Sequence, residues 1–269
     1  MKTSGVEGLR GRPLLRDEEL SLADRVAKEE AARHGYAHLV VYLSGAHAYG
    51  FPSPDSDLDL KCVSVLPRAA FLGLGTPRLT FDRAEVIDSI EIDYTANEIG
   101  AVLSGVLGGN GNFVERLLGH STLEESPALE ELRPLVRAAL SRRAHRHYRG
   151  FARQQLVALE EKPSAKKALY VLRTALTGAH LLASGALVTD VTELFDEYGF
   201  GHARELIEEK RKAERHPLDE ATVARWSAEL RGAVARLDAS FETSALPHAP
   251  PADAAAALDR WLVMFRERQ

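Results

Sequence analysis

Residues 43–61 of the chain read LSGAHAYGFPSPDSDLDLK, and the fold and the chemistry can both be approached from this stretch. In the segment 57–65 polar and apolar side chains alternate from Asp57 through Cys62, which is typical of a β-strand with one buried face. Asp57 and Asp59 are two residues apart on that strand, so both carboxylates project from the same face of a sheet. Upstream, Gly45 lies in a turn where backbone N–H groups can approach an anion, and a short helix beginning there would add donors.

Two carboxylates so close together repel each other, and they are costly beside apolar neighbours unless a cation compensates them. Mg²⁺ suits this role, because it binds one or two carboxylates and completes its shell with water and phosphate oxygens. A third carboxylate on a neighbouring strand would allow two ions, Mg²⁺ or Mn²⁺, to promote an in-line displacement at phosphorus. Asp93 is the candidate, because residues 86–95 also alternate, and Glu91 on the same face is the second choice. The metal ligands predicted from the residues are Asp57, Asp59 and Asp93.

The N-terminal part of the chain combines helical and strand patterns. We expect a helix over 17–34 that ends at Gly35, and a buried strand over 37–43. The alternating segment 86–95 is interpreted as a single strand, and Thr95 to Glu98 as a capping box that opens the next helix. The sequence GGNGN at residues 108–112 breaks that helix.

From about residue 127 onward every long segment has a helical period, with the clearest helices expected over 166–185, 201–215, 218–239 and 252–267. We therefore predict an α+β fold, in which a small mixed β-sheet with flanking helices is followed by an all-α region. The predicted parts are a flexible arm over 1–16, the sheet domain over 17–126 and a helical domain over 127–269.

Composition narrows the class of protein. The 269 residues carry a formal charge of −5, so the molecule as a whole is no polycation, and a polyanion would need a local patch. The single cysteine, Cys62, excludes an internal disulfide and a zinc site built from cysteines, and it fits a reducing compartment. The sequence has no apolar run of signal-peptide or membrane-spanning length, so we expect a cytoplasmic protein without a membrane partner.

The segment GAHAYGFPSPDSDLDL resembles the signature GSHAYG…SPDSDxDL of the DNA polymerase β-like nucleotidyltransferase superfamily. Within it, the chain looks most similar to a bacterial branch of predicted nucleotidyltransferases of the YcgL and RlaP type. The segments NEIGAVLSGVLGGNGNFVERL and KKALYVLR resemble that branch too, so the likeness covers roughly residues 38–185. It implies a nucleotidyltransferase domain over 17–126, a nucleoside triphosphate such as ATP as substrate, and Mg²⁺ held by the three aspartates named above. The nucleotide contacts that it implies are Gly45, Ala46, His47, Lys167 and Arg173.

The chain departs from the family pattern at three positions. Ala46 replaces a serine, which removes one hydroxyl donor to phosphate and bears on rate and triphosphate affinity but leaves the metal site alone. Ser44 is expected to point away from the site if Leu43 faces the core. Tyr170 stands where the family has a histidine, and Gly111 where it has a proline.

The most informative feature outside the motif is arginine. Between Arg133 and Leu159 there are seven arginines and no acidic residue. Charge runs usually form solvated faces, but those mix signs, so an acid-free run in an acidic protein favours contact with a polyanion such as a triphosphate or an RNA backbone. Four of them have i, i+4, i+7, i+11 spacing and are expected on one helical stripe: Arg142, Arg146, Arg149 and Arg153.

These observations favour an enzyme that transfers a nucleoside monophosphate from an NTP to an acceptor hydroxyl and releases pyrophosphate. An RNA end, in RNA repair or modification, is one candidate acceptor; a protein hydroxyl or a small molecule would use the same active site. The alternative is a catalytically weak nucleotide-binding regulatory module. Ala46 favours that alternative, whereas the paired acids Asp57 and Asp59 oppose it.

Overall fold

The computed structural model describes residues 15–212 and 218–269. Most of the expected arm over 1–16, and the last three residues of the helix expected over 201–215, lie outside the described residues. No helix in the described ranges is long and apolar enough to cross a membrane.

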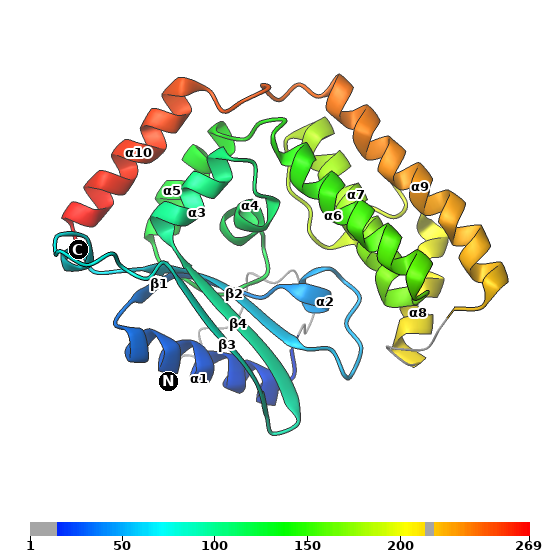
Figure 1. The fold of residues 1–269 in the computed structure, drawn as a ribbon, viewed down its shortest axis with the longest axis horizontal. Helices are drawn as coiled ribbons and strands as arrows, with labels where there is room; N and C mark the ends of the chain where they lie inside the picture. The colour runs from blue at the N-terminus through cyan, green and yellow to red at the C-terminus, as the bar shows by residue number, and fades with distance from the viewer. Residues whose placement is uncertain (1–14, 213–217) are drawn as a thin grey trace, which may run out of the picture.

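A five-stranded mixed sheet forms the N-terminal part of the molecule (Figure 1). Its strands are β1 (Ala37–Tyr42), β2 (Leu58–Val65), β3 (Thr80–Ile87), β4 (Ile90–Glu98) and β5 (Thr122–Glu125), in the spatial order β3-β4-β2-β1-β5. Strands β2 and β4 are parallel, and the other neighbouring pairs are antiparallel. The α+β fold with a small mixed sheet is therefore confirmed.

The segment 86–95, interpreted above as one strand, is instead a hairpin. Asp88 and Ser89 have φ values of 51° and 67°, as the two central residues of a type I′ turn require. The alternating pattern conceals the turn, because only two residues interrupt it. Strand β4 continues through Glu98, so the capping box expected at 95–98 is also wrong. Glu98 alone caps the next helix, its carboxylate accepting a hydrogen bond of 2.6 Å from the Gly100 N–H.

Helices cover both faces of the sheet (Figure 1). Helix α1 (Asp17–His34) has the predicted bounds and ends at Gly35 in the left-handed conformation; its apolar residues pack with those of β2 and β4. Helices α3 (Ile99–Leu107), α4 (Gly111–Leu118) and α5 (Ala128–Ala138) lie on the opposite face. The short helix α2 (Gly45–Ala48) connects β1 to the loop before β2, so a helix does begin at the glycine turn.

The C-terminal half is helical, as expected. It contains α6 (Ala144–Glu161), α7 (Ala165–Ser184), α8 (Arg204–Lys212), α9 (Glu220–Thr243) and α10 (Ala252–Glu267). Helix α7 is buried along most of its length, because α6, α8 and α9 pack around it. One hydrophobic cluster joins β1 and α3 to α5, α9 and α10. Packing is therefore continuous across residues 126 and 127, where the two domains were predicted to meet.

Candidate active site

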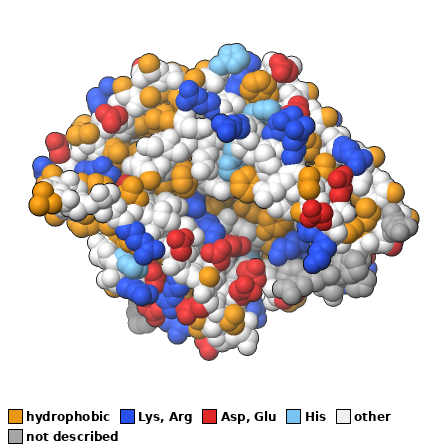
Figure 2. Space-filling model, in the orientation of Figure 1, with side chains coloured by type: hydrophobic (Ala, Val, Ile, Leu, Met, Phe, Trp, Pro, Cys, Tyr) orange, Lys and Arg blue, Asp and Glu red, His pale blue; other side chains and the backbone are white. Residues whose placement is uncertain are grey.

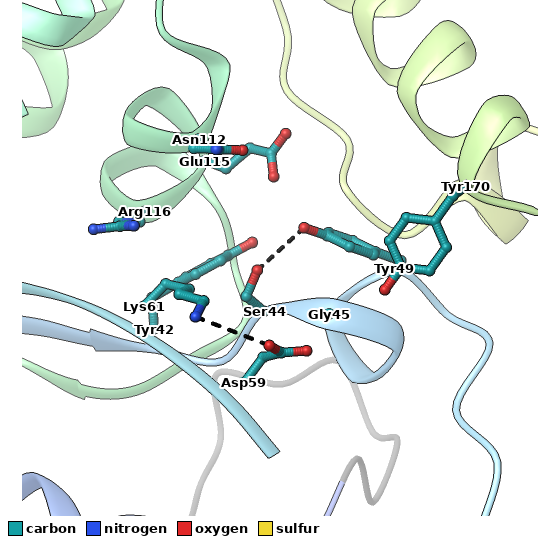
Figure 3. A pocket seen from close by; sticks show the side chains of 10 residues that line it. All are labelled: Tyr42, Ser44, Gly45, Tyr49, Asp59, Lys61, Asn112, Glu115, Arg116 and Tyr170. Atoms are coloured by element: carbon teal, nitrogen blue, oxygen red, sulfur yellow. Dashed lines mark hydrogen bonds and ion pairs between the residues drawn. The ribbon is translucent and has the colours of Figure 1, made fainter. Parts of the chain in front are cut away.

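A pocket of about 220 Å³ lies between the sheet and the helical half (Figure 3). Tyr42 of β1, Ser44 and Gly45 of the glycine turn, and Asp59 and Lys61 of β2 form its floor. Across from them α4 contributes three polar side chains, and aromatic rings close one side. The remaining lining residues are Asn112, Glu115, Arg116, Tyr49 and Tyr170. Of the three predicted metal ligands, Asp59 lines the pocket.

The parallel pairing of β2 with β4 places Asp59 directly beside Asp93, because the two are register partners. Lys61, next but one along β2, lies on the same face, and its Nζ is 2.7 Å from Asp93 Oδ2 and 4.0 Å from Asp59 Oδ1. Glu91 lies two residues nearer the tip of the hairpin, before Ile92, the first residue of β4 that pairs with β2. The register thus brings Asp93 rather than Glu91 to Asp59.

Burial raises the pKa of the Asp59 carboxyl from 3.8 to about 6. Lys61 opposes this rise, the neighbouring charges of Asp93 and Asp57 add to it, and Lys166 opposes it. The three carboxylates are therefore close enough to interact electrostatically, and burial disfavours the ionised form of Asp59 unless a cation compensates its charge.

The residues present fit a hard divalent cation in donor type and charge. Within the described ranges, however, no three His, Cys, Asp or Glu side chains converge as an assembled metal centre. The ammonium group of Lys61 contacts the carboxylates of Asp59 and Asp93 in this structure. A metal would share or replace that interaction.

The glycine turn and the D-x-D motif are in direct contact. Gly45 has φ of +64°, and a Cβ added to it would lie 1.9 Å from Asp59 Oδ2. The Ser44 N–H also donates to the Asp59 carbonyl oxygen at 2.8 Å. Glycine is therefore required here both for the backbone conformation and for the approach of the carboxylate. This contact explains why the two halves of the motif occur together.

Ser44 corrects an expectation from the sequence. Leu43 is fully buried, as assumed, but Ser44 faces the pocket, where its Oγ lies 3.1 Å from the Tyr49 hydroxyl. The physical reason is the strand period: Tyr42 and Ser44 point to the same side, and that side is the pocket. A hydroxyl is thus present even though position 46 is alanine.

The helical wall of the pocket rests on a buried ion pair. Glu115 and Arg173 are 2% and 3% exposed, and Arg173 Nη2 donates to Glu115 Oε2. The Tyr148 hydroxyl donates to Glu115 Oε1 at 3.0 Å, and the Arg173 guanidinium lies 3.7 Å from the centre of the Tyr49 ring. Arg173, expected to contact the nucleotide, thus lies behind the wall and supports it.

Other predicted nucleotide contacts also lie away from the pocket. Lys167 donates through Nζ to the carbonyl oxygens of Ala158 and Lys162 at 2.6 and 2.7 Å, so it binds the C-terminal end of α6. Ala46 is buried in an apolar cluster. His47 is 4% exposed, burial lowers its pKa, and neither ring nitrogen has a hydrogen-bond partner among the described residues.

The predicted arginine stripe does not form as expected. Arg142 precedes α6, and its Nε donates to the Leu246 carbonyl oxygen at 2.9 Å. Arg149 Nε donates to Asp238 Oδ1 of α9 at 2.7 Å. Both face a neighbouring helix or loop, whereas Arg146 and Arg153 remain exposed. In the view of Figure 2, basic side chains lie over the helical part of the molecule, and acidic side chains gather over the lower part of the sheet.

Lys210 of α8 is a residue that the sequence alone did not single out. It is 1% exposed, and its Nζ donates to Ser53 Oγ at 2.6 Å and to Ser56 Oγ at 3.1 Å. These serines belong to the loop that leads into Asp57. The helical half therefore anchors the loop that presents the first carboxylate, from 157 residues away along the chain.

We expect Lys210→Met to loosen this loop. Losing a buried charge-assisted donor should speed amide hydrogen exchange in residues 51–57 by about tenfold, since the free energy of local opening falls by about 1.4 kcal/mol. Hydrogen–deuterium exchange monitored by mass spectrometry measures this. Lys212→Met, an exposed change on the same helix, is the control. Equal exchange in both variants would show that Lys210 does not hold the loop.

Comparison with known proteins agrees with the geometry. Residues 21–264 match the sequence profile of a family described as RlaP, the RNA repair pathway DNA polymerase beta family. The chain belongs to this family. The resemblance stated from the signature is thereby confirmed, and members of this nucleotidyltransferase superfamily generally use divalent metals.

Two further proteins are similar to this RlaP-family chain. The uncharacterized protein MJ0002 of Methanocaldococcus jannaschii is 28% identical over 221 residues, which are 79% of this chain and 88% of that protein. A nucleotidyltransferase-like protein from Exiguobacterium sibiricum, whose crystal structure is known, is 13% identical, with a TM-score of 0.32 over 83% of this chain and 75% of that one.

Proposed function

We propose that this RlaP-family nucleotidyltransferase transfers a nucleoside monophosphate from an NTP to a hydroxyl group at an RNA end and releases pyrophosphate. The observation that carries the proposal is the contact between the glycine turn and Asp59, beside Asp93, at the floor of a pocket. The family description, which names an RNA repair pathway, supports RNA as the acceptor.

Each residue has a role that its position suits. Mg²⁺ or Mn²⁺ held by Asp57, Asp59 and Asp93 would supply charge stabilisation at the reacting phosphorus. Ser44 and Lys61 are donors in the pocket and bind phosphate oxygens. Small-molecule sites usually have a volume of about 300–1,000 Å³, and this pocket is smaller. We therefore assign it to the triphosphate and place the base at its rim.

Asp93 is 51% exposed and lies beside Asp59 in the sheet, so it is the candidate to orient and deprotonate the acceptor hydroxyl. Tyr49 and Tyr170 meet edge to face, with ring centres 5.9 Å apart, and give the pocket a rigid aromatic side. Catalysis in this arrangement consists of positioning and electrostatic stabilisation.

The test is to incubate the protein with each α-³²P-labelled NTP and Mg²⁺ or Mn²⁺, alone and with RNA oligonucleotides, beside Asp57→Ala/Asp59→Ala. Label on RNA that the double variant does not transfer supports the proposal. Label on the protein itself would replace RNA by a protein hydroxyl as acceptor. Nucleotide binding without transfer under all these conditions would favour the nucleotide-binding regulatory module.

Metal affinity should depend on pH through Asp59. Its pKa of about 6 lies above the ordinary carboxyl value, so protons compete with the metal as the pH falls through 6. We expect Mn²⁺ affinity to be constant above pH 7 and to fall up to about tenfold for each pH unit below 6. Isothermal titration calorimetry between pH 5 and 8 measures this. Asp59→Asn should bind weakly at every pH; equal wild-type affinity at pH 5 and 7.5 would exclude Asp59 as a ligand.

A further inference from the structure

A second, open groove of about 560 Å³ lies between α6 and the connection from α3 to α4. The α6 side of the groove follows one helical face, with i, i+3, i+4, i+7, i+8, i+11 spacing. These residues are Arg143, Arg146, His147, Gly150, Phe151 and Gln154. The opposite side is formed by Asn110 and by glycines of the connection. The face of α6 that lines the groove is therefore the one with these six residues, and not the face predicted from the arginine spacing.

The groove is positively charged in a protein whose formal charge is −5. None of its lining residues is acidic. Arg146 is exposed and makes no side-chain hydrogen bond or ion pair to the described residues. Arg143 is exposed too and uses Nη1 to donate to the Leu107 carbonyl oxygen at 3.0 Å, which fixes its position and leaves other guanidinium N–H groups for a ligand. Two such arginines suit two phosphate groups.

An aromatic surface lies on the same helical face. The Phe151 side chain is 42% exposed, and its ring centre is 4.8 Å from that of His147 at an interplanar angle of 36°. Burial lowers the pKa of His147 to about 4, with Arg173 adding to the effect, so its ring is neutral at physiological pH. An exposed ring backed by a neutral one offers a nucleobase a stacking surface.

The connection between α3 and α4 packs closely against α6, because glycine stands at position 109 of the connection and at position 111, the first residue of α4. Gly109 has φ of +82°, and a Cβ on it would lie 2.5 Å from the Arg143 carbonyl carbon. A Cβ on Gly111 would lie 2.5 Å from His147 Cδ2. The latter contact explains the glycine at the position where the family has proline, because no ring fits there.

The groove and the catalytic pocket share this connection. Asn110 lines the groove, and Asn112, two residues later, lines the pocket. On α6, His147 of the groove is followed by Tyr148, whose hydroxyl binds Glu115 of the pocket wall. The two sites therefore flank the start of α4, which a nucleic acid strand with its end in the pocket would cross to enter the groove.

We propose that the groove binds the single-stranded segment of the acceptor RNA next to its reacting end. Arg143 and Arg146 bind two phosphates, and Phe151 stacks on a base. The proposal rests on the proposed function, which supplies the acceptor. Charge and stacking together favour a single-stranded nucleic acid over a phosphorylated peptide, which would use the arginines alone.

The experiment measures the binding of a fluorescein-labelled twelve-nucleotide single-stranded RNA by anisotropy, without NTP, at several salt concentrations. Compared with the wild type, Arg143→Gln/Arg146→Gln should bind at least tenfold more weakly, and the slope of log K against log salt should fall by about 1.4. Phe151→Leu should bind about fivefold more weakly or worse. Arg153→Gln, an exposed arginine of α6 outside the groove, is the matched control and should change affinity less than twofold.

Transfer assays separate this proposal from the function on which it rests. If the wild type binds RNA and the groove variants bind it more weakly, but neither the wild type nor any variant transfers nucleotide, the RNA-binding groove is supported and the proposed function is wrong. If the wild type transfers nucleotide to RNA and the groove variants have the same RNA affinity and KM as the wild type, the proposed function is supported and the proposal that the groove binds RNA is overturned. An Arg153→Gln effect equal to that of the arginine pair, or a wild type that binds no RNA, also overturns it.

Discussion

Asp59→Asn is expected to reduce nucleotidyl transfer about a thousandfold or more and, at the same time, to stabilise the metal-free protein. The first effect follows because Asp59 is the carboxylate that lines the pocket and touches the glycine turn. The second follows from its raised pKa. Above pH 6 the Asp59 carboxyl of the folded protein is ionised although burial disfavours its charged form, and this destabilises the fold. The destabilisation disappears as the pH falls toward 4.

The gain in stability at pH 8 should be about 1 to 3 kcal/mol, since a pKa raised from 3.8 to about 6 corresponds to at most about 3 kcal/mol, and the side chain is 23% exposed. Urea unfolding in EDTA measures it. Added Mg²⁺ should raise the unfolding temperature of the wild type and leave that of the variant unchanged.

Asp55→Asn provides the matched control, because Asp55 is exposed, lies in the loop that leads into β2 and undergoes the same chemical change. Its activity should stay within about twofold of the wild type, and its free energy of unfolding within about 0.5 kcal/mol. An Asp59→Asn protein that stays active would show that Asp59 takes no part in the reaction. One that loses activity and stability together would indicate that Asp59 supports the fold instead.

Arg173→Met is expected to lower the free energy of unfolding by about 3 to 5 kcal/mol. The substitution leaves the Glu115 carboxylate buried, with the Tyr148 hydroxyl as its remaining hydrogen-bond donor in the described structure, and removes the cation from above the Tyr49 ring. Removing both charges, in Glu115→Gln/Arg173→Met, should recover most of the loss, because no unpaired charge then remains. Urea unfolding of the two variants gives the comparison.

An exposed ion pair supplies the control for this prediction. Arg204 and Asp196 are 51% and 72% exposed and lie 2.7 Å apart. Arg204→Met should therefore leave the urea unfolding midpoint close to that of the wild type. If Arg173→Met cost equally little, or if the double variant were less stable than the single one, the buried pair would not be what supports the pocket wall.

Much of the secondary structure could be predicted because local patterns decide it. Helix α1 ends at a glycine with the left-handed geometry, and α10 has the expected bounds. The hairpin at Asp88 and Ser89 escaped detection because a two-residue turn barely disturbs alternation. Strand β5 is only four residues long and carries little signal of its own.

The sequence by itself determined which groups share a face. The period of two puts Asp59 and Lys61 on the same side of β2, and the resemblance of the motif indicated its chemistry. The partner of Asp59 was decided by the parallel register of β2 and β4, which sets Asp93 rather than Glu91 beside it. Register depends on how strands distant in the chain pack together, so no local pattern encodes it.

Tertiary structure alone also decided which cations lie in the pocket. Sequence spacing could not show that Lys167 would bind the end of α6 or that Arg173 would pair with Glu115. Long basic side chains bind the nearest carboxylate or carbonyl that burial leaves in need of a partner. Those partners come from helices far apart in the chain, and only the packing of the helical half against the sheet brings them together.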